Sequence, residues 1–470
     1  MDCDPHRLPL PPTAWLCCLW LASCGLLAHA APTEDPPRYH LRYQRPTDRV
    51  ADVKVEYAAH GHLKTPGDQK IETVDMDVVA RFEFQDRHLA AFRDRSAGAE
   101  TALHAARRYH RIDATLTIGD DRISPVLRDE QHLLGVTYRD GLLQYVSPNG
   151  PLTRDELDLI RLPADRQILS LLLPENPVEV GSVWKPSATA LATLLAIDTV
   201  GDSDVTSTLE GIERGFARVE LAGVVHGALA GVATEIALKC RYYFYIDRGE
   251  FASLQLVTRE RRAIGYVNPG VDVTARLKMR LDPHRAAAAL ADDQLQSLRK
   301  ALELPNQTLV YHSPDLGVVF EHGRDWYATA EDREAVVLRQ LFRGELIAQC
   351  NVSRLPSVKK GKAITLTQFQ KDIQKNLGDH FGSFVRANEK TNDRGDLIYR
   401  VEAEGTASNV PVQWIYYLLS DSGGRRVATV FTMEQDQVAR FGAADEDWVR
   451  SLKFISRNEP DNKRVSESAK

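Results

Sequence analysis

The sequence predicts an α+β protein of two domains that follow an exported leader. Three observations lead to this prediction. An uncharged apolar run fills residues 14–30, strands with a period of two dominate residues 38–282, and a stretch rich in Ala, Leu, Gln and Arg separates these strands from a mixed C-terminal region. A chain of 470 residues exceeds what a single core usually serves, so we expect more than one domain.

The leader has the features of a signal peptide. Its apolar run is shorter than the roughly 20 residues that a membrane-spanning helix needs. Small residues at Ala28 and Ala30 precede Ala31, which is the pattern of a cleavage site. We therefore predict a signal peptide over residues 1–30, cut between Ala30 and Ala31, and a secreted or periplasmic protein of bacterial type.

The same leader contains an alternative processing site. The residues Leu21-Ala22-Ser23-Cys24-Gly25 resemble the lipobox at which bacterial lipoproteins are cut and acylated on cysteine. Lipidation at Cys24 would tether the protein to a membrane through its N-terminus, and this is the only membrane contact that the sequence suggests. A free protein and a tethered one both remain open at this point.

The charge and the cysteine content exclude a nucleic-acid-binding protein and a disulfide-stabilised scaffold. The formal net charge is −6, and no basic stripe points to a nucleic-acid partner. Four of the six cysteines lie in the leader, so disulfide bonds are not the scaffold of the exported part. The other two, Cys240 and Cys350, occupy inward positions of alternating strands, and we expect buried free thiols rather than a bridge between domains.

Residues 31–283 are expected to form a curved antiparallel sheet. The clearest strand is residues 235–247, where Ile236, Cys240 and Phe244 share one face with other apolar residues while charged residues lie on the opposite face. A turn at 247–250 then predicts a hairpin with residues 251–262. Further strands are predicted over residues 38–44, 50–60, 74–84, 109–118, 135–146, 216–224 and 271–281.

Helices are expected at two places in this part of the chain. The apolar residues of 153–173 predict one or two short helices, broken at Pro163, that cover the sheet. Residues 284–305, which include RAAAALADDQLQSLRKALEL, predict a connector helix by propensity and periodicity.

Residues 306–456 are expected to form an antiparallel sheet flanked by helices. Thr365 or Thr367 is placed to cap a helix whose stripe of Phe369, Ile373 and Leu377, followed by Phe381, would pack on the sheet. A final helix is predicted around residues 444–452. The tail 457–470 is too polar to join a core, so we expect it to be disordered.

The C-terminal region resembles the PsbP-like domains. The resemblance rests on the segment Tyr311-His312-Ser313-Pro314-Asp315-Leu316-Gly317-Val318-Val319-Phe320, on Trp326, and on the closing Asp447-Trp448-Val449-Arg450-Ser451-Leu452-Lys453-Phe454. The proline usual before the Trp is replaced here by Gly323-Arg324-Asp325. The resemblance implies an accessory or binding subunit and no catalytic residue.

A second phrase, residues 173–184 (LPENPVEVGSVW), resembles a motif of uncharacterised bacterial secreted proteins with large curved sheets. The nearest characterised shape is the curved sheet of the LolA type, which binds lipid or lipoprotein tails. This resemblance implies an apolar ligand for the first domain.

Two groups of residues are candidates for binding. Arg241, Tyr243 and Tyr245 lie on the polar face of the clearest strand and would form an aromatic, cationic ligand surface, although cross-strand packing explains the tyrosines as well. His60 and His62 would point to one face of a strand, as metal ligands do, but the sequence supplies no third ligand, and we favour a frayed strand end without metal.

The common catalytic signatures are absent from the sequence, since it has no G-x-S-x-G, H-E-x-x-H, P-loop or G-x-G-x-x-G motif. We therefore assign no catalytic, cofactor or metal residue and expect no cofactor. The expected function is that of an exported, non-catalytic binding or accessory protein whose partner is an unknown protein or an apolar ligand. The alternatives are a hydrolase with a site assembled from distant loops and a structural component of the cell envelope.

Overall fold

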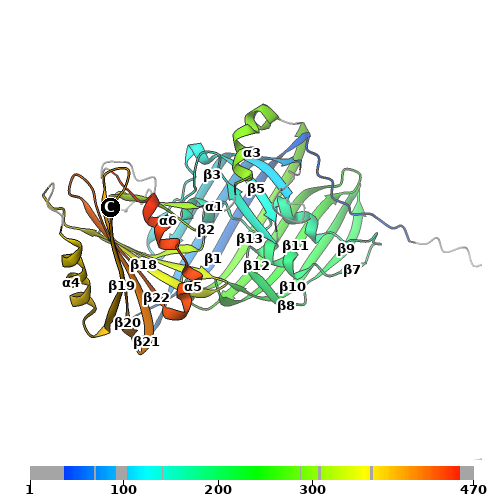
Figure 1. Cartoon of the computed structure of the whole chain (residues 1–470). Helices are drawn as coiled ribbons and strands as arrows, with labels where there is room; N and C mark the ends of the chain where they lie inside the picture. The colour runs from blue at the N-terminus through cyan, green and yellow to red at the C-terminus, as the bar shows by residue number, and fades with distance from the viewer. Residues whose placement is uncertain are drawn as a thin grey trace, which may run out of the picture. The chain divides into compact units, whose positions relative to one another are not determined.

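The computed structural model of the chain describes residues 36–67, 70–90, 103–139, 141–285, 287–304, 308–359 and 364–455 (Figure 1). Residues Arg38–Lys470 form one compact unit, separate from Met1–Pro37. The predicted signal peptide, with Cys24, Ala30 and Ala31, and the predicted disordered tail lie outside the described residues.

The largest element is an antiparallel sheet of thirteen strands. Its hydrogen-bonding order is β6-β5-β3-β2-β1-β13-β12-β11-β10-β9-β7, with β4 paired to β3 and β8 paired to β10. The strands are β1 (Arg49–Pro66), β2 (Ile71–Leu89), β3 (Leu103–Ile118), β4 (Asp121–Ile123), β5 (Leu133–Arg139), β6 (Leu142–Val146), β7 (Val183–Trp184), β8 (Thr199–Ser203), β9 (Thr206–Glu213), β10 (Phe216–Leu229), β11 (Val232–Tyr245), β12 (Glu250–Arg262) and β13 (Gly270–Arg285).

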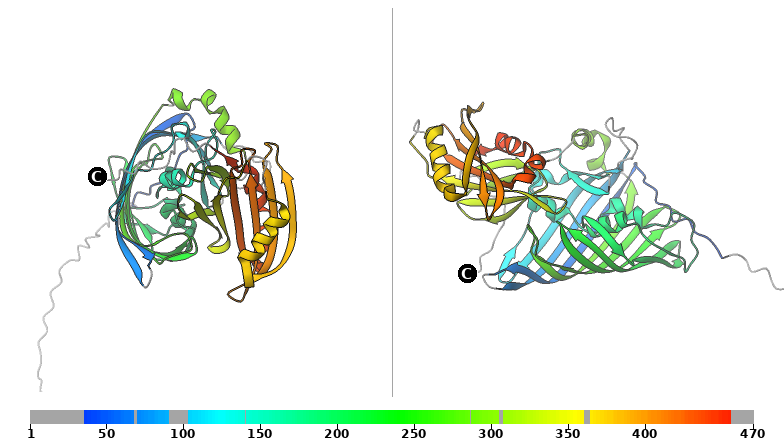
Figure 2. Two further views of the ribbon diagram at one scale, coloured as in Figure 1. Left: turned by 90° about the vertical axis from the view of Figure 1, so that its left-hand side faces the viewer. Right: turned by 60° about the horizontal axis from the view of Figure 1, so that its bottom comes forward.

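This sheet is strongly curved, and short helices lie on its concave side (Figure 2). They are η1 (Asp129–Gln131), α1 (Arg154–Ile160), η2 (Arg166–Leu172) and α2 (Ala188–Leu195). Leu157, Ile168 and Leu191 from these helices share one core with Phe82, Leu221 and other inward residues of the strands. The break between α1 and η2 falls at the predicted Pro163, because proline cannot continue a helix.

Two smaller sheets follow in the sequence. A three-stranded sheet has the order β14-β15-β23, and a seven-stranded sheet has the order β16-β17-β18-β22-β21-β20-β19. Their strands are β14 (Leu309–Ser313), β15 (Val318–His322), β16 (Trp326–Glu331), β17 (Ala335–Phe342), β18 (Glu345–Leu355), β19 (Phe381–Thr391), β20 (Leu397–Ala407), β21 (Val410–Ser420), β22 (Arg426–Glu434) and β23 (Lys453–Phe454).

Helices pack on both faces of the seven-stranded sheet. On one face lies α4 (Leu366–Leu377), whose N-cap Thr365 accepts a hydrogen bond from the Gln368 amide, as the sequence predicted. On the other face lie α5 (Val438–Phe441) and α6 (Ala444–Ser451), which follow η6 (Gln435–Gln437). The predicted Phe381 lies beyond α4 and η5 (Gly378–His380), at the start of β19.

The predicted α+β class is wrong, because the protein is mostly β. Strands account for 56% of the described residues and helices for 17%. The predicted connector helix over 284–305 does not form. Strand β13 continues to Arg285, and the chain then makes η3 (Ala288–Leu290), η4 (Asp292–Leu295) and the short α3 (Gln296–Leu302).

Tertiary contacts explain why the Ala-rich segment is not one helix. Leu290, Leu295 and Leu298 pack into a core with Val50 and other residues of the large sheet. The Leu290 carbonyl accepts a hydrogen bond of 2.6 Å from Arg87 Nη1 of β2, which fixes this turn against the large sheet. Ala291 is extended, with φ −68° and ψ 157°. These buried contacts outweigh an intrinsic preference that is worth only tenths of a kcal/mol per residue.

Several contacts join the large sheet to the C-terminal sheets. The Val310 amide donates to the Leu152 carbonyl at 2.9 Å, and Arg324 Nη2 donates to the Tyr145 carbonyl at 2.6 Å. The turns at Gly231 and Gly344 touch, with φ of +78° and +85°, and a Cβ on Gly344 would lie 2.2 Å from the Gly231 Cα. Only glycine fits both positions, because each requires positive φ and an approach of bare backbone.

Candidate functional site

A cavity of about 610 Å³ lies on the concave side of the large sheet. Its volume falls within the range of known small-molecule sites. The cavity is built from three parts of the chain: inward side chains of β1–β3, the segment from Arg128 to Leu162, and the strands β14 and β15. We call it the sheet cavity.

The wall on the sheet side is apolar. It consists of inward-facing residues of neighbouring strands, among them Tyr57, Val78, Ala80, Phe82, Ala114 and Leu116. The register places them side by side, since Ala80 pairs with both Tyr57 and Ala114, and Val78 pairs with Leu116. They alternate with exposed residues such as Asp77, Val79 and Arg81, which lie on the opposite face of the sheet.

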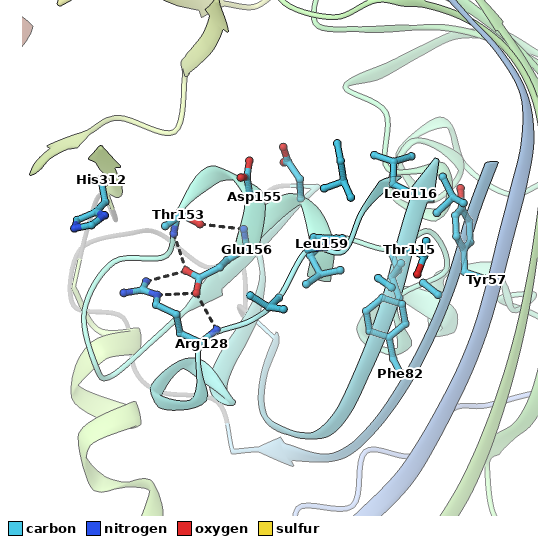
Figure 3. Close-up of a pocket in the computed structure, with 18 of the residues that line it drawn as sticks. Tyr57, Phe82, Thr115, Leu116, Arg128, Thr153, Asp155, Glu156, Leu159 and His312 are labelled. Carbon is cyan, nitrogen blue, oxygen red and sulfur yellow. Dashed lines mark hydrogen bonds and ion pairs between the residues drawn. The ribbon is translucent and has the colours of Figure 1, made fainter. Parts of the chain in front are cut away.

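The opposite wall is formed by helix α1, shown in Figure 3. Asp155, Asp158 and Leu159 line the cavity with the spacing i, i+3 and i+4, which places them on one side of the helix, and Leu162 lines it just beyond the end of α1. The first two side chains are polar and the last two apolar. The wall is therefore amphipathic along its length.

A capping box and an ion pair fix the start of α1. The Thr153 hydroxyl accepts from the Glu156 amide at 3.1 Å, and Glu156 Oε2 accepts from the Thr153 amide at 2.8 Å. Arg128 makes a bidentate ion pair with Glu156, at 2.7 Å from Nε and 2.8 Å from Nη2 (Figure 3). This pair keeps α1 at a set distance from the segment that precedes β5.

The third wall comes from the C-terminal region. In β14 and β15 the residues alternate, so that Tyr311, Val318 and Phe320 enter the core of the C-terminal sheets while Val310 and Val319 face the cavity. His312 also lines the cavity (Figure 3). The motif residues that resemble PsbP-like domains, including Trp326, Trp448 and Leu452, are thus mainly residues of a packed core.

A buried ion network lies elsewhere on the concave side and anchors η2. Arg107 donates to Asp86 at 2.9 Å and to Asp165 at 2.8 and 3.1 Å, and Arg166 contacts Asp86 at 2.5 Å. Tyr145 donates to Asp165 at 2.9 Å. We call these five residues the η2 network.

The charges of the η2 network compensate one another. Burial alone would raise the pKa of the Asp86 carboxyl, but Arg107 and Arg166 outweigh it and hold this pKa below its usual value. All five side chains are buried, so none of them faces a ligand. The η2 network is therefore a structural anchor for the helices on the concave side.

The electrostatics of the α1 wall differ from those of the η2 network. Asp158 has Arg154 as an ion-pair partner at 3.8 Å. Its pKa is raised, because the protein atoms around it disfavour the charged form more than Arg154 and Arg161 favour it, although the side chain is 60% exposed to solvent. Asp155 has no hydrogen-bond or ion-pair partner among the described residues. The polar end of the sheet cavity therefore presents two carboxyl groups.

The residues that the sequence singled out lie outside this cavity. Arg241, Tyr243 and Tyr245 are on the outer side of β11, where Arg241 pairs with Glu220 at 2.9 Å and the Tyr245 ring contacts Phe216 with centroids 4.6 Å apart. Both contacts are cross-strand pairs that stabilise the sheet.

The His-x-His pair is also separate from the cavity. His62 Nδ1 lies 2.9 Å from Asp75 Oδ1 on the neighbouring strand. In the part of the chain that the structure describes, no group of three or more His, Cys, Asp or Glu side chains is placed to hold a metal ion.

The two remaining cysteines behave as predicted. Cys240 and Cys350 are free and buried, in different cores. Burial raises the pKa of Cys240 to about 12, so its thiol stays protonated at neutral pH.

The sequence did not identify the sheet cavity, although two signals for it were present. The alternation of Val78, Ala80 and Phe82 marks an inward face, and the spacing of Asp155, Asp158 and Leu159 marks a side of α1 that is partly polar and partly apolar. Neither signal shows that these faces meet, or that β14 and β15 complete the wall.

No family model matches the chain, and no curated protein does. Among solved structures, the chain is similar to cyanobacterial PsbP from Synechocystis, with 19% identity and a TM-score of 0.26 over 32% of this chain and 94% of that one. It is also similar to lipovitellin, with 11% identity and a TM-score of 0.31, over 53% of this chain and 26% of that one. Among the described residues no helix has the length and apolar character needed to cross a membrane.

Proposed function

We propose that this chain is an exported, non-catalytic binding protein that holds an apolar small molecule in the sheet cavity. The observation that carries the proposal is the cavity itself, with a volume of about 610 Å³ and an inner wall of Val78, Ala80, Phe82, Ala114 and Leu116. An apolar molecule that binds there displaces the water in contact with this wall. Binding is then favoured by a free energy of about 25 cal/mol for each Å² of apolar surface that is covered.

The C-terminal region has an accessory role in this proposal. As a PsbP-like domain it would serve as a wall of the site, because β14 and β15 supply Val310, His312 and Val319 to the cavity. The rest of the domain would hold these two strands in place through the core that contains Phe320 and Trp448. It would supply no chemistry of its own.

The protein would carry out this function outside the cytoplasm. The leader predicts cleavage between Ala30 and Ala31, or acylation at Cys24. The intact mass of the protein from its natural host distinguishes a chain that starts at Ala31 from one that starts at a lipid-modified Cys24. An uncleaved leader would contradict export by either route.

The binding proposal is tested with N-phenyl-1-naphthylamine, an uncharged dye that fluoresces in apolar surroundings. We expect the full exported chain to bind it, and Ala114→Phe to weaken binding at least about tenfold, because the ring occupies the cavity. Ala237→Phe is the matched control, since Ala237 is exposed on β11. Equal dye binding by both variants, or none by the parent protein, would overturn the proposal.

Native mass spectrometry of the purified protein separates binding from catalysis. A bound apolar molecule that is released unchanged after prolonged incubation supports a binding protein. Conversion of that molecule by the parent protein, lost in Ala114→Phe, would instead favour the hydrolase alternative.

A further inference from the structure

We propose that the ligand of the sheet cavity is an amphiphile with a cationic head group, which lies beside Asp155 and Asp158 while its hydrocarbon part lies against the sheet. This inference rests on the proposed function, because it specifies the ligand of the same site. It follows from the shape of the site and from the distribution of charge around it.

The site has two compartments. Next to the sheet cavity lies a second recess of about 280 Å³, and the two share Thr153, Asp155 and Val310 in their walls. The recess is the more polar of the two, since Arg154, His322 and Glu331 also line it. A ligand that fills both compartments must therefore be apolar at one end and polar at the other.

The two guanidinium groups of the site are already engaged by the protein. Arg128 is held in its bidentate pair with Glu156 and also donates to the Pro151 carbonyl at 3.0 Å. Arg154 donates to the carbonyls of Arg324 and Trp326, and its guanidinium lies over the Tyr327 ring, 4.3 Å from the centroid. Both groups line the site, but oxygen atoms of the protein already accept hydrogen bonds from each of them.

The carboxyl groups of the site are less completely engaged. Asp155 has no hydrogen-bond or ion-pair partner among the described residues, and Asp158 has a single ion-pair contact, the long one to Arg154. The charged side chains that line the sheet cavity are Arg128 against Asp155, Glu156 and Asp158. This acidic excess attracts a cation and repels an anion.

The position of the two carboxyl groups matches the head of such a ligand. Asp155 and Asp158 are about one turn apart on α1, and the apolar Leu159 and Leu162 follow them in the lining of the cavity. An alkyl chain laid along this lining would meet leucines and then carboxylates. The Asp158 side chain is 60% exposed, so a cation beside it keeps much of its own hydration.

The test compares three probes of equal chain length as competitors for the dye: dodecylamine, dodecanol and dodecanoate, all below their micelle concentrations. We expect the amine to displace the dye at a concentration at least about tenfold lower than the acid, with the alcohol between them. In Asp155→Asn/Asp158→Asn the amine and the alcohol should become equal. Both side chains are exposed, so this variant is expected to fold.

A control variant removes two carboxylates elsewhere. Asp372→Asn/Asp379→Asn changes the net charge by the same amount at exposed positions of α4 and η5, and should keep the preference for the amine. If the alcohol competes while the amine is no tighter than the acid, the cationic head group is excluded and the apolar site stands. If none of the three competes, the proposed function fails as well.

Discussion

The seven-stranded sheet is covered on both faces, whereas the thirteen-stranded sheet leaves part of its concave face open to a cavity. In β21 Ile415 and Tyr417 point into one core, while the alternating Trp414 and Tyr416 point into another. Both faces of this strand are therefore packed, and neither is left for a ligand. In the large sheet, Val78 and Leu116 face the cavity instead. The difference indicates that binding capacity belongs to the large sheet, and that the C-terminal sheet is a rigid support.

The difference has a physical origin in what each sheet is packed against. A long amphipathic helix such as α4 covers its face along its whole length, with Phe369, Ile373 and Leu377 buried. The concave face of the large sheet is covered by helices of seven or eight residues. Because they are short, they leave part of the concave face over β1–β3 open to the cavity.

The largest effect that we expect tests the η2 network. Arg107→Met leaves Asp86 and Asp165 buried without their shared cation, which should lower the free energy of unfolding by about 3–5 kcal/mol. Urea unfolding followed by circular dichroism measures this loss.

A matched variant lies on the same strand. Arg111→Met removes an arginine that is 56% exposed and pairs with Asp113 at the surface, so its cost should stay below about 1 kcal/mol. Equal losses in the two variants would mean that the η2 network is not what holds the helices on the concave side.

The next effect tests whether α4 stabilises the seven-stranded sheet by packing on one of its faces. Leu377→Ala creates a cavity beneath α4 and should cost about 2–4 kcal/mol in thermal or urea unfolding, without changing dye binding, because Leu377 does not line the sheet cavity. Leu142→Ala, at a position that is 56% exposed, should change stability by less than about 0.5 kcal/mol. A weaker affinity for the dye in folded Leu377→Ala would show that the two sheets are not functionally distinct.

The smallest effect concerns pH. Burial raises the pKa of the Glu250 carboxyl, although Arg49, Arg166 and Arg248 oppose this, and neither oxygen has a hydrogen-bond partner among the described residues. A carboxyl with a higher pKa in the folded state binds its proton more tightly there. The folded state therefore loses stability as the pH rises through the range between the unfolded and folded pKa values, and the loss is complete above the folded value.

Glu250→Gln should accordingly raise the thermal midpoint at pH 7, and its advantage over the parent protein should shrink as the pH approaches about 4, near the ordinary pKa of Glu. Differential scanning calorimetry at the two pH values measures the change. A variant that is less stable at pH 7 would show that the ionised carboxylate is stabilised by the arginines around it.

The sequence predicted those features that depend on neighbours in the chain. The alternation that includes Cys240 and Phe244 is found in β11, which pairs with β12 in the predicted hairpin. Thr365 caps α4, and the break at Pro163 separates α1 from η2. Each of these features depends on residues within about ten positions of one another, so a local reading of the sequence could find it.

Features that depend on distant contacts could not be predicted in this way. Leu290, Leu295 and Leu298 pack on the large sheet and Leu290 is hydrogen-bonded to Arg87 across 203 residues, whereas the predicted connector helix follows only local propensity. The α+β class was wrong because strands make up most of the described structure. The sheet cavity requires Ala114, Leu159 and Val310 to meet, and no periodicity contains that information. The residues proposed from sequence, Arg241, Tyr243 and Tyr245, had the composition of a binding surface but lie on the outer side of β11.

The ends of the two large sheets have a consequence for the protein in concentrated solution. At its ends the large sheet has β6, with five residues, and β7, with two, which are too short to pair with another chain over any length. The end strands of the seven-stranded sheet, β16 and β19, are interrupted by β-bulges, and β19 carries exposed Arg386, Glu389 and Lys390. A protein with so much sheet is thereby protected against edge-to-edge aggregation, and changes that smooth β19 would remove that protection before they disturb any core.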